Sequence, residues 1–251
     1  MAKSFIYPNA NLLTATLTDG TFAADVFTPS SSVTNEERIN DMSIGSAVGS
    51  FGLNDVIRID LGASPGTIDT FAFYSNQVDA NFLVLYGSNS ATDMATAKAT
   101  FIDGLALGWN VDVTLDDNLR YWFIRATDGT LDGITEIILG TKYTFDITPN
   151  TGIVEGKLSG SDINKSYGAI EYSNKRHELI KTWDWQWDVP TTAIKTSLEA
   201  IETAVDLNYK KLIYYDGTTY YWVRIQPNSF KFTWQAYNFW TTPMSLVQQL
   251  Q

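Results

Sequence analysis

Short segments of alternating apolar and polar residues, each followed by a turn-forming sequence, recur through the first 145 residues. Alternation with turns at such intervals predicts the strands of an all-β sandwich or jelly roll. Only Ala91–Phe101 has a composition that suits a helix, and we interpret it as a loop or a single turn. The predicted strands are Val56–Leu61, Ile68–Tyr74, Phe82–Tyr86, Arg120–Arg125 and Ile134–Leu139.

One segment of the second part of the chain predicts a helix, near residues 192–206. Apolar residues recur there at i, i+4, i+7 and i+11, which places them on one face of a helix. They are Ile194, Leu198, Ile201 and Val205. Pro190, Thr191 and Thr192 supply a start, since threonine is a favoured capping residue. Such an apolar face needs a surface to pack on.

Strands surround this helix in the sequence. Asp216-Gly217, between the alternating segments Lys211–Tyr215 and Thr219–Ile225, is a strong short-range signal for a β-hairpin. Further alternation predicts strands at Lys181–Asp188, Ser229–Gln235 and Met244–Leu250. The sequence therefore predicts a mainly β fold: an N-terminal β-sandwich (jelly roll), followed by a C-terminal antiparallel β domain with one packed α-helix.

Charge and tryptophan divide the 251 residues into the same two parts. Residues 1–150 hold 18 of the 28 acidic residues but only 7 of the 17 basic ones, and so account for the whole net charge of −11. The remainder is balanced, yet it holds six of the eight tryptophans. At this length two domains are the default, and we predict them at residues 1–145 and 146–251. Turn-forming residues between Gly140 and Gly160 mark the boundary.

Composition excludes several classes of function. A pI near 4.4 argues against binding to nucleic acid, which needs clustered lysine and arginine, and against an anionic membrane surface. There are no cysteines, so disulfides, thiolate metal sites and a cysteine nucleophile are excluded. No apolar run is long enough to span a bilayer, and Met1–Pro8 is not followed by the apolar stretch of a signal peptide. We expect no cofactor, no metal and no membrane insertion.

Several short motifs in the first part occur in the order of a known family. They are Ile59-Asp-Leu-Gly62, Ile68-Asp-Thr70, Tyr86-Gly-Ser-Asn89, Leu119–Arg125 and Ile134-Thr-Glu-Ile137, with Asn11-Leu-Leu13 as an opening. Together they resemble a discoidin-like domain (coagulation factor 5/8 C-type, galactose-binding-like) over roughly residues 9–140. Val56 or Ile57 stands where the family usually has an aromatic residue.

The resemblance implies recognition of glycans, lipids or proteins through loops at one end of the barrel. Candidate loops are Thr28–Asn54, Ser75–Asn81 and Gly104–Asn110, the last of which carries Trp109. Trp109 either stacks on a sugar face or packs back onto the sandwich. Oxygen ligands for calcium are present nearby, but without the spacing of a calcium loop they favour a solvated turn. Those residues are Asp112, Asp116, Asp117 and Asn118.

The second part resembles the ring-forming proteins of long-tailed bacteriophages, the tail tube, terminator and distal tail (baseplate hub) group. The resemblance rests on the strand Tyr172–Asp188, the helix Thr192–Val205, the Tyr-Tyr-Asp-Gly hairpin and the final Ser-Leu-Val-Gln-Gln-Leu strand. It implies self-association into a ring, with other virion tail proteins as partners. It also implies a place in the virion, after assembly in the host cytoplasm.

The tryptophans of the second part allow two interpretations. Three of them share one face of a predicted strand, where they form either the core of the C-terminal sheet or a seam between subunits. The number of aromatic residues favours the seam, because aromatic rings are enriched at interfaces. The predicted interface residues are Trp183, Trp185, Trp187, Trp234 and Trp240.

Catalytic motifs are absent from the sequence. His177 is the only histidine and lies among charged residues, as surface histidines do. Asp184 and Asp188 fall on one strand face and suit a glycosidase pair in principle, but nothing distinguishes them from a polar strand face. We therefore expect no enzyme. We expect a structural subunit of a phage tail or baseplate that displays its β-sandwich for host attachment. The alternative is a carbohydrate-binding, lectin-like protein without a role in a virion.

Overall fold

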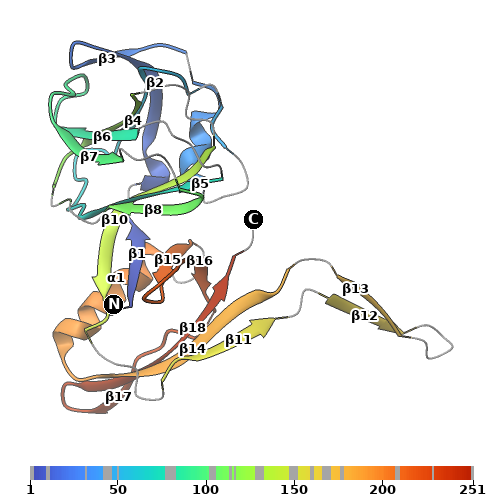
Figure 1. Ribbon diagram of the computed structural model, residues 1–251. Coiled ribbons are helices and arrows are strands. Elements are labelled where there is room, and N and C mark those ends of the chain that lie inside the picture. Colours follow the sequence, from blue (N-terminus) through green and yellow to red (C-terminus); the bar gives the residue numbers. More distant parts are fainter. Residues whose placement is uncertain are drawn as a thin grey trace. The chain divides into compact units, whose positions relative to one another are not determined.

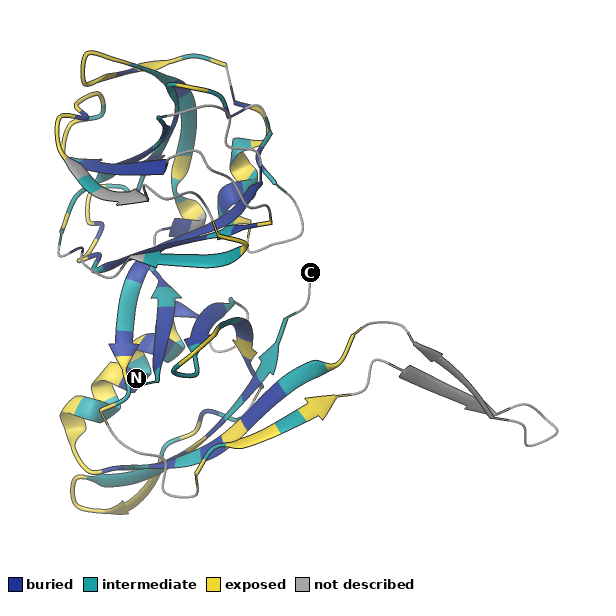
Figure 2. Cartoon of the chain, in the orientation of Figure 1, coloured by how far each residue is buried: buried dark blue, intermediate teal, exposed yellow. Residues whose placement is uncertain are grey.

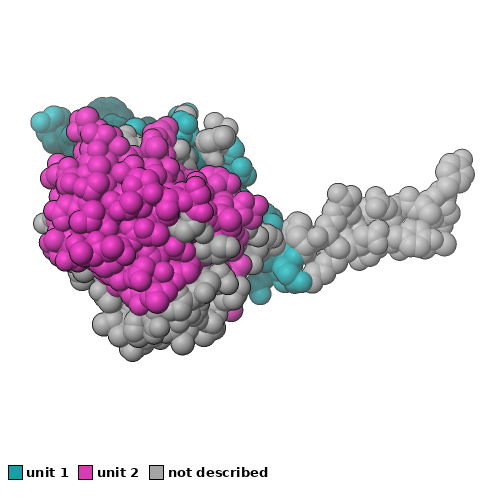
Figure 3. Space-filling view, turned by 90° about the horizontal axis from the view of Figure 1, so that it is seen from above, with its two compact units in different colours: residues 1–5, 143–250 teal, residues 6–142, 251 magenta. Residues whose placement is uncertain are grey.

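The computed structural model describes most of the chain and divides it into two compact units. Unit 2 is made of residues 6–142, and unit 1 of residues 1–5 and 143–250 (Figure 3). The first residues of the chain thus belong with the C-terminal part. The described residues are 3–9, 12–31, 33–41, 47–49, 51–76, 83–101, 106–112, 115, 117–127, 133–146, 152–158, 161–165, 171–175, 178–206, 210–227 and 229–249.

Unit 2 is a sandwich of two antiparallel sheets (Figure 1). One sheet has the strand order β3-β2-β4-β9-β6-β7, and the other has the order β1-β10-β5-β8. The first is built from β2 (Thr16–Ala23), β3 (Val26–Pro29), β4 (Asp55–Asp60), β6 (Leu83–Ser88), β7 (Ala97–Phe101) and β9 (Tyr121–Ala126). The second is built from β1 (Ser4–Pro8), β5 (Thr70–Ser75), β8 (Gly108–Asp112) and β10 (Ile134–Thr144), and β1 and β10 each also extend into unit 1. Two short 3-10 helices, η1 (Leu12–Thr14) and η2 (Glu36–Asn40), complete the described elements of this unit.

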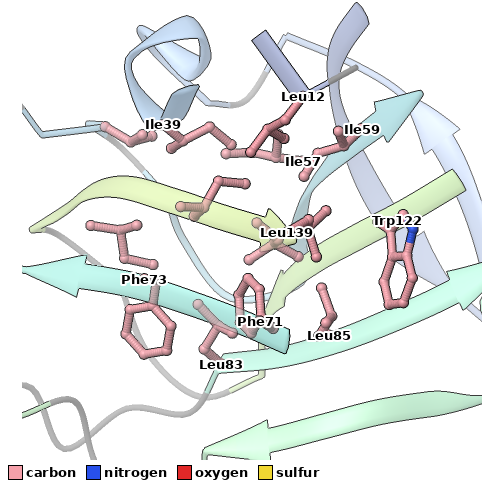
Figure 4. Packing of buried hydrophobic residues seen from close by; sticks show 14 of the residues in the cluster. Leu12, Ile39, Ile57, Ile59, Phe71, Phe73, Leu83, Leu85, Trp122 and Leu139 are labelled. Carbon is pink, nitrogen blue, oxygen red and sulfur yellow. The ribbon is translucent and has the colours of Figure 1, made fainter. Parts of the chain in front are cut away.

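Alternate residues of both sheets fill one core between them (Figure 4). Ile57 and Ile59 of β4 and Trp122 of β9 enter it from the first sheet, and Phe71 and Phe73 of β5 enter it from the second. Removing this much apolar surface from water is the main force that stabilises the sandwich. The strands predicted in this part are confirmed. Ala91–Phe101, interpreted as a loop or turn, instead ends in strand β7, because Ala97–Phe101 pairs with β6.

The described residues of unit 1 form an antiparallel sheet with one helix. Its strand order is β11-β14-β18-β16-β15-β1, with β17 paired to β18 as well and β12 paired with β13 in a separate hairpin. The bounds are β11 (Val154–Leu158), β12 (Ser161–Lys165), β13 (Glu171–Lys175), β14 (Ile180–Val189), α1 (Thr192–Ala204), β15 (Leu212–Tyr215), β16 (Tyr220–Ile225), β17 (Thr233–Ala236) and β18 (Phe239–Gln248).

The helix α1 begins where the sequence predicts it. Thr191 is the N-cap, and its side-chain oxygen accepts a hydrogen bond from the backbone N–H of Ile194 at 3.3 Å. This bond satisfies one of the N–H groups that a helix leaves free at its start. Leu198, Ile201 and Val205 are buried, as their spacing predicts. The mainly β fold with a sandwich and one packed helix is confirmed.

Two strands of unit 1 differ from the prediction in extent. The last strand begins at Phe239 rather than Met244, so β18 is long enough to pair with β14 from Thr182 to Val189. The predicted strand Ser229–Gln235 begins only at Thr233 and pairs with the start of β18. A β-hairpin therefore forms at this end of the sheet, with Tyr237 and Asn238 at its turn.

Candidate interaction surfaces

The three tryptophans of β14 lie in the core of unit 1. Cross-strand pairing places Trp183, Trp185 and Trp187 opposite Leu246, Met244 and Thr242 of β18, all on one face. All three indole rings are buried. The structure thus supports, for these three residues, the alternative that the sequence left open: they form the core of the sheet.

Aromatic rings from distant parts of the sequence complete this core. The ring centroids of Phe145 and Trp187 are 5.0 Å apart and meet edge to face, and Phe5 lies 5.8 Å from Tyr214. Burial raises the pKa of the Tyr214 hydroxyl. Such edge-to-face contacts add to the effect of burial alone. The first strand and the segment after the sandwich are therefore both needed for unit 1 to have a complete core.

The same sheet face continues beyond this core to the β17–β18 hairpin. Val189 is opposite Trp240, and Trp240 is opposite Trp234, so all three share the face of the buried tryptophans. Burial falls along this row: Val189 is buried, Trp240 is half-buried, and Trp234 is 67% exposed. At the turn, Tyr237 is 89% exposed. We call Trp234, Tyr237 and Trp240 the hairpin patch.

The helix α1 anchors this hairpin at Trp240 and at the turn. The Lys195 ammonium lies 5.5 Å from the centroid of Trp240 and 5.3 Å from that of Phe232, within the range of a cation–π interaction. Thr192 on α1 also bonds the side chain of Asn238 at 3.1 Å. All four residues of β17 nevertheless remain exposed (Figure 2). The hairpin is thus held in place but largely uncovered.

A second apolar surface lies at the other edge of the same sheet. β11 pairs with Ile180–Asp184 of β14, and it places Val154 and Leu158 on one strand face. Both residues are exposed, as is Leu179, which directly precedes β14. We call Val154, Leu158 and Leu179 the arm-base patch, because β12 and β13 continue from here as a two-stranded arm (Figure 1).

Trp109, the predicted sugar-binding residue, lies in a strand of unit 2 rather than in a loop. It belongs to β8, the edge strand of its sheet, and is opposite Tyr74. The two rings meet edge to face with centroids 5.4 Å apart. Phe71 and Phe73 of β5 enter the sandwich core, so Tyr74 and Trp109 lie on the opposite, outer face. Trp109 therefore packs on the sandwich, outside its core.

The remaining candidate residues are not brought together as a site. The Asp117 carboxylate pairs with the Lys98 ammonium at 3.2 Å, Asn118 is exposed, and Asp116 and the side chain of Asp112 lie outside the described part. His177 also lies outside it. Among the described residues, no three acidic, histidine or cysteine side chains are grouped closely enough to hold a metal. In the same part of the chain, no helix is long and apolar enough to cross a membrane.

Sequence reasoning missed a set of arginines on the outer face of the six-stranded sheet. The Arg125 guanidinium lies 3.5 Å from the ring centroid of Phe22 and donates hydrogen bonds to Asn54 Oδ1 at 2.7 Å and Tyr86 Oη at 3.2 Å. Arg58 lies 4.9 Å from the ring of Phe27. The aliphatic stems and planar guanidinium groups of Arg58 and Arg125 cover a second, smaller apolar cluster. The sequence does carry a signal for this position: Arg58 and Arg125 each stand between apolar residues of an alternating strand, so they face away from the sandwich core.

An ion pair lies at the end of this row. Arg120 donates to both carboxylate oxygens of Asp60, at 2.7 and 2.8 Å. The hydrogen bond from Arg120 holds the pKa of Asp60 below its ordinary value. The Arg120 guanidinium also lies 4.7 Å from the ring of Tyr121. This two-point contact fixes the segment that leads into β9.

Comparisons with known proteins add little. No protein-family model and no curated protein matches this chain. Among solved structures, chitosan-binding module 1 of a chitosanase/glucanase from Paenibacillus sp. IK-5 is similar, with 16% sequence identity. The likeness covers 54% of this chain and 99% of the module, with a TM-score of 0.39. At this TM-score the likeness supports no conclusion about the function of this chain.

Proposed function

We propose that this protein is a structural subunit that assembles with copies of itself through unit 1. The observation that carries the proposal is the hairpin patch, where Trp234 is 67% and Tyr237 89% exposed. Large aromatic residues are enriched at protein interfaces and dominate their binding energy. The same unit buries four other tryptophans, so its fold does not lack room for such rings. Exposure of these two therefore favours a role in contact with a partner.

The area of the patch sets the expected strength. An aromatic side chain buries about 150–250 Å², so covering the exposed parts of Trp234 and Tyr237 removes roughly 300 Å² from water. At ~25 cal/mol per Å² this contributes about 7–8 kcal/mol before costs. Association costs an estimated 4–15 kcal/mol in lost freedom of motion. The hairpin patch alone thus gives weak association, and a stable assembly needs a further contact surface.

The finer proposal is a component of a bacteriophage virion, in a tail or baseplate ring, with the sandwich displayed towards the host surface. It rests on the sequence resemblance of the second part to ring-forming tail proteins and on the hairpin patch. The balanced charge of residues 151–251 also supports it, because copies approach through this part without net repulsion.

The test is the molar mass of the full chain by light scattering over a concentration series. We expect masses above the 28.0 kDa of one chain at high concentration. A Trp234→Ser, Tyr237→Ser variant should shift the series towards the monomer. A Leu53→Ser, Leu107→Ser variant is the matched control, because it removes two exposed apolar residues from unit 2. A monomeric wild type at every concentration would refute the proposal.

A second candidate function is carbohydrate binding by unit 2, with or without a virion role. The observation that favours it is the position of Trp109 beside Tyr74 on the outer face of an edge strand. A stacked sugar would gain about 0.5–1.5 kcal/mol per ring, roughly a 2- to 13-fold change in affinity. Trp109→Ala should weaken binding to cell-wall polysaccharide by that factor, whereas Leu107→Ala should not. Equal binding by both variants removes Trp109 from any site.

A further inference from the structure

The strand β11 is an edge of the unit 1 sheet. In the described part of the chain it pairs only with β14, so the backbone N–H and C=O groups on its other side face away from the sheet. Four of its five residues are exposed and the central one is half-buried (Figure 2). The strand contains no proline, and its pairing with β14 has no bulge. Such an edge offers a row of donors and acceptors to which another strand can add.

The sequence of β11 is complementary to itself about its central residue, Gly156. One step away on either side are Glu155 and Lys157, of opposite charge, and two steps away are Val154 and Leu158, both apolar. If two antiparallel copies of β11 pair with glycine opposite glycine, each Glu155 lies opposite a Lys157 and each Val154 lies opposite a Leu158. A symmetric pairing centred on Glu155 or on Lys157 would instead put like charges directly opposite each other, which is destabilising.

The two kinds of pair lie on different faces of the sheet. Glu155 is opposite Trp183 within one copy and so shares the face of the aromatic core, whereas Val154 is opposite Asp184 on the other face. Leu158 is opposite the half-buried Ile180. Pairing of β11 with a second copy therefore adds opposite-charge pairs on one face and apolar pairs on the other. Both kinds of cross-strand pair stabilise an antiparallel sheet.

The neighbouring charges are compatible with this pairing. Within one copy Lys157 lies opposite Lys181, whose ammonium donates a hydrogen bond to Tyr221 Oη at 2.8 Å. Pairing places the second copy's Glu155 on the other side of Lys157, which offsets the repulsion between the two lysines. Asp184 would lie roughly 20 Å from the same residue of the second copy, four residues along and three strand spacings across. At that distance, about twice the screening length in dilute salt, the two carboxylates scarcely repel each other.

We infer that two copies pair through β11 about a two-fold axis at Gly156, so that their unit 1 sheets join into one sheet. The inference rests on the proposed self-association through unit 1, and it supplies the further contact surface that the hairpin patch requires. The same strand serves on both sides, so this contact is isologous and closes at two copies. The hairpin patch belongs to β17 and β18 and is not used in this contact.

The absence of cysteine from the chain makes a direct test possible. Glu155→Cys and Lys157→Cys place thiols at positions that the inference sets directly opposite each other, with Cα atoms about 5 Å apart, which a disulfide can span. Two copies of the same variant hold their thiols on a diagonal, with Cα atoms about 7–8 Å apart, which a disulfide does not span. Ala200→Cys, exposed on α1, is the matched control.

Each full-length variant is oxidised alone and in equimolar mixtures, in which one member carries a mass tag. We expect a disulfide-linked dimer from the mixture of Glu155→Cys with Lys157→Cys. Either variant alone, and either one mixed with Ala200→Cys, should remain unlinked.

Charge variants test the same register without a covalent bond. Glu155→Lys and Lys157→Glu each put like charges opposite each other in a pair of identical copies. Each should therefore raise the Kd of the dimer about tenfold, measured by light scattering over a concentration series. An equimolar mixture of the two variants puts opposite charges together again and should restore the association of the wild type.

Three results would contradict the inference. A disulfide that Lys157→Cys forms with itself as readily as with Glu155→Cys would overturn the register centred on Gly156. Oligomers in light scattering, with neither the mixed disulfide nor the restored association, would overturn the pairing of β11 but leave self-association through unit 1 intact. A wild type that is monomeric at every concentration would refute both proposals.

Discussion

Replacing Trp187 by alanine tests whether the tryptophans of unit 1 divide into core and surface groups. The Trp187 ring is fully buried and meets Phe145 edge to face at 5.0 Å and Trp185 at 5.4 Å. Burial of about 150–250 Å² at ~25 cal/mol per Å² is worth about 4–6 kcal/mol. This is an upper estimate, since the unfolded chain already buries part of that surface. Measured core substitutions of this kind cost about 3–5 kcal/mol.

The assay is urea unfolding of the full chain at 25 °C, followed by tryptophan fluorescence. Six of the eight tryptophans belong to unit 1, so the signal reports mainly that unit. We expect Trp187→Ala to lower the free energy of unfolding by about 3–5 kcal/mol. The matched change Trp234→Ala should alter it by less than about 0.5 kcal/mol in dilute protein, because the side chain is mostly exposed. Equal losses from the two variants would refute the division into core and surface groups.

Three smaller changes test unit 2. In Gly140→Ala the new Cβ would overlap the backbone oxygen of Tyr7. Urea unfolding should therefore show that the free energy of unfolding falls by about 2–3 kcal/mol. An unchanged free energy would mean that β1 and β10 are not so close. Ala24 has a φ of 50° in the two-residue turn between β2 and β3. Asparagine tolerates this left-handed backbone better than alanine does, so Ala24→Asn should raise stability by about 0.5–1 kcal/mol in a thermal melt. The Arg120 hydrogen bond keeps the pKa of Asp60 below 3.8, so its stabilising effect is present above that pH and is lost as the pH falls. Asp60→Asn should therefore lower the melting temperature at pH 7 and have a progressively smaller effect as the pH falls below 3.8, and a difference that grows in acid would contradict the ion pair.

Local pattern predicted most elements of the fold. Each element buries one face, and that face leaves a periodic pattern of apolar residues in the sequence. The period is two residues in β4, β5 and β9, and it is helical in Ile194–Val205. The Asp216-Gly217 turn likewise defines its hairpin: the Asp216 side chain accepts hydrogen bonds from the backbone N–H groups of Thr218 and Thr219.

Long-range partners were not predictable in the same way. Phe5 and Phe145 lie on either side of the sandwich in the sequence, yet they pack against the tryptophans of β14. Nothing in the residues around Phe5 indicates a partner about 180 positions away. Charge and turn-forming residues indicate where the chain changes character near residue 145. They could not indicate that the first five residues belong with unit 1.

The candidate surfaces were predicted only in part. Five tryptophans were grouped by residue type, but exposure depends on what covers each one. β18 and distant aromatic rings cover those of β14, whereas α1 meets the β17–β18 hairpin at Trp240 and Asn238 and leaves Trp234 exposed. Tyr237 and the arm-base patch were missed, because their exposure follows from the extents of β11 and β17 rather than from their local sequence.

Hydrogen–deuterium exchange of the full chain at low and high protein concentration tests the central claim most directly. If copies associate through unit 1, the backbone amides of residues 233–241 and 154–158 should exchange more slowly at high concentration. Those of unit 2 should exchange at the same rate in both samples, because the account places no contact there. Protection confined to residues 6–142, or none at all where light scattering shows an oligomer, would contradict the account.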